Sequence, residues 1–141
     1  MGKALKGTYK PVNPDKYVGD SLPIYRSSWE LAVCRMCDNH DNIIQWGSES
    51  IKIPYRNPLT GKYTVYVPDF LVLLEDSEGH QKLELWEIKP RKQTFVEEAK
   101  QPRDKAALAV NAVKWQAAQA WSSKHGAIFR VINENDIFRN T

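Results

Sequence analysis

The arrangement of apolar and polar residues in the middle of the chain predicts two strands joined by a tight turn. Residues 70–74 and 83–88 are rich in aliphatic and aromatic side chains, and the polar stretch 77–80 separates them. Apolar side chains occupy both faces of this hairpin: Leu71, Leu73, Leu83 and Leu85 on one, and Phe70, Val72, Leu74, Trp86 and Ile88 on the other. Strands of this kind are usually covered by helices on both sides of the sheet.

The segments before the hairpin predict one helix and several short strands. Ser27 or Ser28 can cap a helix that runs to about Asp38, and the polar stretch 39–42 ends it. Strand-like composition follows at 43–46 and 51–55, then a turn at 57–61 and a segment at 62–67 that leads into the hairpin.

The segments after the hairpin predict a long helix and a last strand. Pro90 ends the second strand, and residues 95–124 have a helical pattern with a break near Pro102. Apolar side chains recur at helical spacing and are expected to face the core: Val110, Val113, Ala117, Ala120 and Trp121. Residues 127–132 form a final strand and 133–137 a turn or short helix, so the whole order predicts an α/β domain.

Composition bounds the class of protein without naming an activity. A chain of 141 residues with 42% hydrophobic and 26% charged residues is one globular domain. Residues 1–24 are rich in Lys, Pro, Gly and Asn and are expected to form an extended basic arm, with the domain at 25–141. The net charge of +3 permits nucleic-acid binding. No apolar run approaches a membrane span and no signal peptide is visible, so a reducing cytoplasm, or a particle assembled there, is expected.

Cys34 and Cys37 form a CxxC pair with His40 nearby. A structural zinc site needs four ligands and the chain has no second pair. A redox pair would sit at the start of a helix, whereas this pair lies late in one. We therefore expect two semi-buried thiols that pack in the core, and no zinc site.

Two carboxylates and an amine are predicted to meet at the open end of the hairpin. Asp69 and Glu87 are equidistant from Glu78, so a turn centred there places them side by side, roughly 5 Å apart between Cβ atoms. Lys89 lies two residues beyond Glu87 and shares its face. Such a group can hold Mg²⁺, with the carbonyl of Ile88 and waters as further ligands.

Lys89 and Glu30 complete the predicted site. An ammonium beside two carboxylates stays protonated, so Lys89 is expected to position the attacking water rather than act as a base. A helix lying against the open end of the sheet can bring Glu30 beside the metal as a third carboxylate. The simpler alternative is an ion pair between Lys89 and Asp69 without a metal.

Pro68-Asp69 and Glu87-Ile88-Lys89, with the helical Glu30 upstream, resemble the PD-(D/E)XK nuclease superfamily. Tyr66-Val-Pro-Asp-Phe70 and Trp86-Glu-Ile-Lys89 are similar to the versions in the endonuclease subunit of heteromeric transposases. The resemblance is closer to the head completion nucleases of T-even-type tailed phages. It extends over nearly the whole chain: Gly7 to Tyr17, Tyr25 to Glu30, Glu87 to Pro90, and Ala109 to Trp115.

The resemblance implies a DNA endonuclease with a restriction-endonuclease-like α/β core, a mixed central sheet and flanking helices. It implies a catalytic set of Glu30, Asp69, Glu87 and Lys89, with the three acids holding Mg²⁺, for which Mn²⁺ can substitute. It also implies a role late in head maturation, before tail attachment. DNA and portal or neck proteins would be the partners, in the host cytoplasm during assembly or at the head–tail connector of the virion.

Basic residues near these segments are candidates for phosphate contacts: Arg26, Arg91, Lys92, Lys105 and Lys114. For each of them the alternative is a solvated surface charge. Two other functions stay open. One is a structural head–tail component that uses the nuclease fold as a binding module, for which the arm is the reason. The other is a transposase or restriction-type endonuclease with the same catalytic set.

Overall fold

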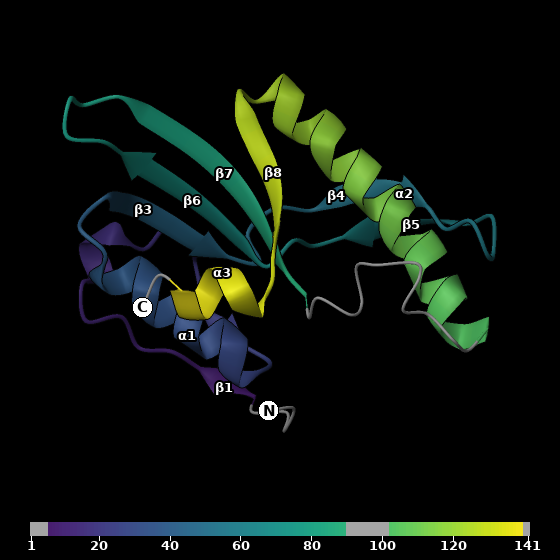
Figure 1. Cartoon of the computed structure of the whole chain (residues 1–141), viewed down its shortest axis with the longest axis horizontal. Coiled ribbons are helices and arrows are strands. Elements are labelled where there is room, and N and C mark those ends of the chain that lie inside the picture. The colour runs from purple at the N-terminus through teal and green to yellow at the C-terminus, as the bar shows by residue number, and fades with distance from the viewer. Residues whose placement is uncertain (1–5, 90–101, 140–141) are drawn as a thin grey trace.

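The computed structural model describes residues 6–89 and 102–139, and its centre is a four-stranded mixed sheet (Figure 1). The strand order is β3 (Ile43–Ser48), β6 (Phe70–Glu75), β7 (Gln81–Ile88) and β8 (Ala127–Ile132). The first three are antiparallel, and β8 runs parallel to β7. The α/β class, the mixed sheet with a central antiparallel hairpin and the flanking helices are confirmed.

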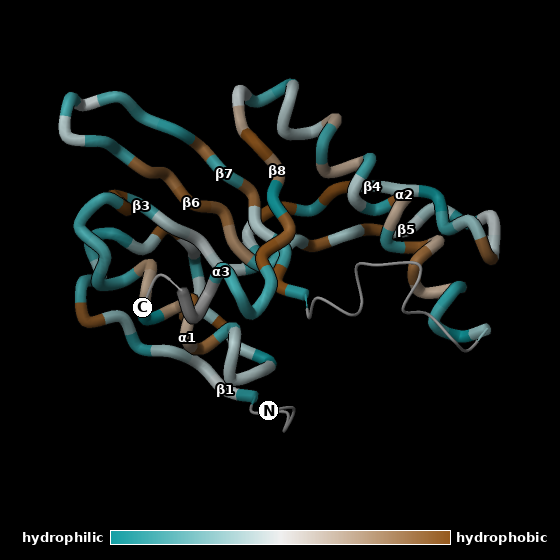
Figure 2. Tube along the Cα trace, in the orientation of Figure 1, coloured by the Kyte–Doolittle hydropathy of each residue, from teal (hydrophilic) through white to brown (hydrophobic). Residues whose placement is uncertain are grey.

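The β6–β7 hairpin has the predicted register. Phe70 pairs with Trp86 and Glu75 with Gln81, so the hairpin is centred on Glu78. The Asp76 carboxylate accepts hydrogen bonds from backbone N–H groups in the turn, and Gly79 adopts a positive φ of 85°. Figure 2 shows hydrophobic positions along β6 and hydrophilic ones at this turn.

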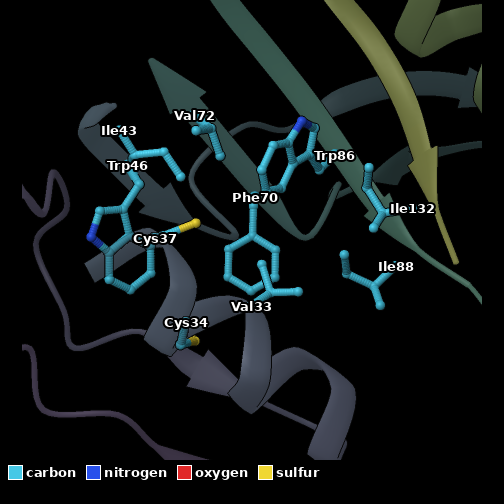
Figure 3. Close-up of a cluster of buried hydrophobic side chains, with 10 residues drawn as sticks. All are labelled: Val33, Cys34, Cys37, Ile43, Trp46, Phe70, Val72, Trp86, Ile88 and Ile132. Atoms are coloured by element: carbon cyan, nitrogen blue, oxygen red, sulfur yellow. The ribbon is translucent and has the colours of Figure 1, made fainter. Parts of the chain in front are cut away.

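One face of the sheet is covered by α1 (Ser28–Asn39), beside which α3 (Glu134–Arg139) lies. The Ser27 side chain caps α1 by accepting a hydrogen bond from the Glu30 N–H. The predicted even-numbered positions of β6 and β7 face this helix. Figure 3 shows the resulting core: Val33, Cys34, Cys37, Ile43, Trp46, Phe70, Val72, Trp86, Ile88 and Ile132.

The opposite face packs against α2 (Pro102–Lys124) and a second hairpin, β4 (Ile53–Arg56) and β5 (Tyr63–Tyr66). The buried residues of this layer are Ile53, Tyr66, Leu85 and Ala118. The predicted inward face of α2 is partly wrong: Ala120 is exposed, and the helix buries Asn111, Ala118 and Ser122. The predicted helical residues 95–101, and Pro90 before them, lie outside the described residues.

Cover on this second face is incomplete. Leu73 and Leu83 line an open groove of about 120 Å³ together with residues of β3 and Leu71. The expectation of helices on both faces therefore holds at the end of the sheet nearest Asp69 and Glu87, where Leu85 is buried. At the turn end, Leu73 and Leu83 are only half-buried by the residues that the structure describes.

The N-terminal segment 6–24 lies on the domain. It contains β1 (Gly7–Thr8), the 3₁₀ helix η1 (Pro14–Lys16) and the first residue of β2 (Ile24–Tyr25), which pairs with β1. The fully buried carboxylate of Asp38 accepts hydrogen bonds from the Tyr9 hydroxyl and from the backbone N–H groups of Val12 and Asn13. These bonds tie the segment to the end of α1.

No helix among residues 6–89 and 102–139 is long and apolar enough to cross a membrane.

Candidate active site

Asp69 lies at the start of β6, between the ends of the two neighbouring strands. Its Oδ2 accepts a hydrogen bond of 2.7 Å from the Ile88 N–H of β7, and its backbone carbonyl accepts one of 3.0 Å from the Glu49 N–H that follows β3. Oδ1 accepts no hydrogen bond from any residue that the structure describes. One oxygen is therefore held in place and the other is available to a ligand.

Glu87 lies across from Asp69 in the register and is only 7% exposed. Its Oε1 accepts a hydrogen bond of 2.6 Å from the Tyr66 hydroxyl. Its Oε2 lies 3.6 Å from the ammonium of Lys89. The structure therefore brings Asp69, Glu87 and Lys89 together, and the ion pair of Lys89 is with Glu87 instead of Asp69.

Glu30 reaches the same region from the first turn of α1. Its carboxylate accepts a hydrogen bond of 3.1 Å from the Arg26 N–H. Its charge acts on both Asp69 and Glu87, which places it on the same side of the domain. Within residues 6–89 and 102–139, no three Asp, Glu, His or Cys side chains gather closely enough to hold one ion. Glu30 thus borders the site without closing a ligand shell around it.

Burial dominates the electrostatics of these acids. Desolvation raises the pKa of Asp69 well above its usual value, and the charges of Glu87 and Glu30 raise it further. Desolvation also raises the pKa of Glu87, although the Tyr66 hydrogen bond and Lys89 oppose the shift. The pKa of Glu30 is raised, again chiefly by burial. Burial thus disfavours the ionised forms of these acids, and a divalent cation beside them would favour those forms.

The donor set fits magnesium. Mg²⁺ prefers carboxylate oxygens, keeps several waters and is commonly bound by one or two protein carboxylates. Asp69 and Glu87 supply these from adjacent strands. The Ile88 N–H holds Asp69 in place, and a metal contact from the Ile88 carbonyl stays a prediction.

Two residues of the site were missed by the sequence reasoning. Tyr66 is buried at the end of β5 and holds Glu87. Glu49 follows β3, and the register places it across from Asp69, so that Glu49, Asp69 and Glu87 form a row. Tyr66 is part of the segment that carries the family resemblance, which is the one signal for it. Glu49 has no such signal, because its place depends on a long-range strand register.

The residues predicted to contact phosphates lie in different surroundings. The Arg26 guanidinium forms a two-pronged ion pair with Glu49, with N–O distances of 3.0 and 3.2 Å. The Lys114 ammonium lies 5.5 Å from the centre of the Tyr66 ring, and its charge lowers the pKa of Glu87 against the effect of burial. Lys105 is exposed on α2. Arg91 and Lys92 lie outside the described residues.

Cys34 and Cys37 are both fully buried between α1 and the sheet. Burial raises the pKa of the Cys34 thiol to about 12 and that of Cys37 well above its usual value. Both residues are core packing groups in the thiol form.

Two comparisons with known proteins agree with this geometry. Residues 40–134 match the family described as TnsA-like endonuclease N terminal. The chain is also 35% identical to the head completion nuclease of Enterobacteria phage T4, over 95% of this chain and 94% of that protein. The matched residues include Asp69, Glu87 and Lys89 together with the sheet that positions them. The chain therefore belongs to the TnsA-like endonuclease family, as an endonuclease with the PD-(D/E)XK arrangement of a restriction-endonuclease-like core.

Proposed function

We propose that this protein is a divalent-metal-dependent endonuclease that cuts DNA during the completion of a phage head, before the tail is attached. The observation that carries the proposal is the cross-strand placement of Asp69 and Glu87 with Lys89 beside them. The similarity to the head completion nuclease of phage T4 supports the biological setting.

The chain's own residues account for the binding and positioning steps. Asp69 and Glu87 would hold Mg²⁺, with Mn²⁺ as a substitute, and Glu30 would hold a water ligand or a second ion from α1. When bound, the metal polarises the phosphate and lowers the pKa of a bound water. Lys89 is fixed by its ion pair with Glu87 and by the bond from its N–H to the Ile132 carbonyl, and orients the attacking water.

The test is metal-dependent cleavage of linear, circular and branched DNA. Asp69→Asn and Lys89→Ala are expected to lower the cleavage rate at least 100-fold, because each removes a group that acts on the reacting phosphate or its metal. Glu75→Gln is the matched control, since Glu75 lies at the far end of the same strand. Full activity in Asp69→Asn and Lys89→Ala would refute the site.

The setting suggests partners and a place of action. We propose that the protein acts in the cytoplasm of the infected host and contacts portal or neck proteins of the maturing head. Complementation of a phage that lacks the protein tests this: Asp69→Asn should enter particles normally but yield few infectious ones. Normal infectivity with that variant would instead favour a structural head–tail component.

A further inference from the structure

Positive charge is concentrated in one part of the molecule. We define the basic lobe as residues 51–68, which contain the β4–β5 hairpin, and residues 102–125, which contain α2. It carries seven basic residues, Lys52, Arg56, Lys62, Arg103, Lys105, Lys114 and Lys124, against the single acid Asp104. The other described residues carry nine basic residues against fourteen acids. The mild net charge of the chain therefore combines a strongly basic lobe with an excess of acidic residues in the rest of the described structure.

The two parts of the basic lobe form one packed unit. Ile53 and Tyr66 of the hairpin are buried in the same cluster as Ala118 of α2, and Figure 1 shows the helix alongside β4 and β5. The Lys114 ammonium lies over the rings of Tyr55 and Tyr66, at 5.8 and 5.5 Å. The other six basic residues are exposed. Their charges therefore face solvent from a fixed scaffold.

The hairpin also exposes apolar side chains that a monomer would normally cover. Tyr63 is 80% exposed, Leu59 is more than half exposed, and Val65 is half exposed. Tyr63 lies directly across from Arg56 in the β4–β5 register. An aromatic ring across from an arginine on a hairpin without acidic residues is complementary to the phosphates, sugars and base faces of a nucleic acid.

The basic lobe is continuous with the active site. Tyr66, the last residue of β5, donates its hydroxyl to Glu87, and the chain reaches Asp69 three residues later. α2 has 23 residues and is about 35 Å long, close to one turn of B-DNA. Its basic residues occur near both ends and at Lys114, close to the site. DNA that enters the site thus meets a basic surface of matching length.

We infer that the basic lobe is the surface that holds the DNA duplex beside the cut, with phosphates on its lysines and arginines and Tyr63 against the sugar–base edge. This inference rests on the proposed function, because it identifies how the substrate of that site is held. On this inference, the basic lobe provides most of the affinity for DNA, whereas the acidic site with Lys89 carries out the cleavage.

Binding without cleavage separates this inference from the proposed function. The affinity of the full chain for a fluorescent 20-base-pair duplex is measured by anisotropy in EDTA over a range of NaCl concentrations. The test variant is Lys52→Gln/Lys62→Gln/Lys105→Gln, three exposed residues of the lobe. The matched control is Lys6→Gln/Lys10→Gln/Lys82→Gln, three exposed lysines outside it. Both variants lower the net charge equally.

The lobe variant is expected to bind DNA at least tenfold more weakly than wild type. The slope of log K against log salt concentration should become shallower by about two to three, because each lost phosphate contact releases about 0.9 fewer counterions. The control should change affinity less than twofold. Equal losses in the two variants, or no loss in the lobe variant with an unchanged melting temperature, would overturn the inference.

Tyr63→Ala adds an independent reading. It should weaken binding several-fold without changing the salt slope, because base or sugar contact releases no counterion. An unchanged affinity would remove Tyr63 from the interface. If wild type binds DNA through the lobe but never cuts it with any metal, the proposed function fails while the assigned surface stands.

Discussion

At the scale of single residues, the site is shaped by a hydroxyl that the acidic motif does not contain. Tyr66 donates to Glu87, and this bond works against the burial that raises the pKa of Glu87. The distance of 2.6 Å is typical of a strong O–H to carboxylate hydrogen bond. Tyr66 is therefore a positioning residue: its hydrogen bond favours the ionised form of Glu87 and leaves the other carboxylate oxygen facing Lys89.

Tyr66→Phe removes only this hydroxyl. The pKa of Glu87 should rise further, so the acid limb of the kcat/KM profile should move to higher pH. A hydrogen bond to a charged group contributes about 1.5–3 kcal/mol, which predicts a loss of roughly tenfold or more near neutral pH. Activity should partly return as the pH is raised. Glu75→Gln, at the far end of β6, serves as the control, and an unshifted profile in Tyr66→Phe would contradict this role.

The acidic motif itself was predictable because its two halves flank one short turn. A hairpin centred on Glu78 can pair Asp69 only with Glu87, so local spacing determines the contact. Tyr66 and Glu49 depend on how β5 and β3 meet that hairpin, which no local pattern encodes. The inward face of α2 was predicted only in part for another reason: many of its positions are alanine, so its apolar stripe is weakly marked.

At the scale of elements, the N-terminal segment is held by one buried acid. Two opposing effects act on the pKa of Asp38: burial raises it, and hydrogen bonds from Tyr9, Val12 and Asn13 lower it. The hydrogen bonds dominate, so the pKa is lowered. A lowered pKa means that the folded state favours the carboxylate. Its contribution is present above the ordinary pKa of an aspartate and is lost as the pH falls through the lowered value.

Asp38→Asn should lower the free energy of unfolding by about 2–4 kcal/mol near neutral pH, because charged acceptors are lost in a buried network. The difference from wild type should shrink as the pH falls from the ordinary pKa of an aspartate through the lowered pKa of Asp38, where the folded wild type becomes protonated. Urea denaturation at several pH values measures this. Asp41→Asn, an exposed neighbour, should change little. A pH-independent difference would argue against the charge as the cause.

At the scale of the whole molecule, a buried acid of the candidate site lowers the stability of the fold. The raised pKa of Asp69 means that its ionised form is disfavoured in the folded protein. Without metal, stability is therefore lost as the pH rises from the ordinary pKa of an aspartate through the raised value. Active sites often lower the stability of the protein that carries them.

Asp69→Asn should accordingly melt at a higher temperature than wild type in EDTA at pH 8. The difference between the two melting temperatures should become smaller near pH 4.5. Added Mg²⁺ should raise the melting temperature of wild type, because binding to the folded state stabilises it by mass action. It should do so less in Asp69→Asn. Differential scanning fluorimetry measures both, with Glu75→Gln as the control. A wild type that melts higher than Asp69→Asn in EDTA at pH 8 would contradict the electrostatic account.

The parallel pairing of β7 with β8 has a consequence for synthesis of the chain. The Lys89 N–H is bound by the carbonyl of Ile132, and this partner follows 43 positions later, after α2. A ribosome releases the acidic motif long before it releases that partner, so a nascent chain holds Asp69 and Glu87 while Lys89 is still unanchored. The order of elements thus delays the anchoring of Lys89, and with it a competent nuclease, until Ile132 and the rest of β8 have been made.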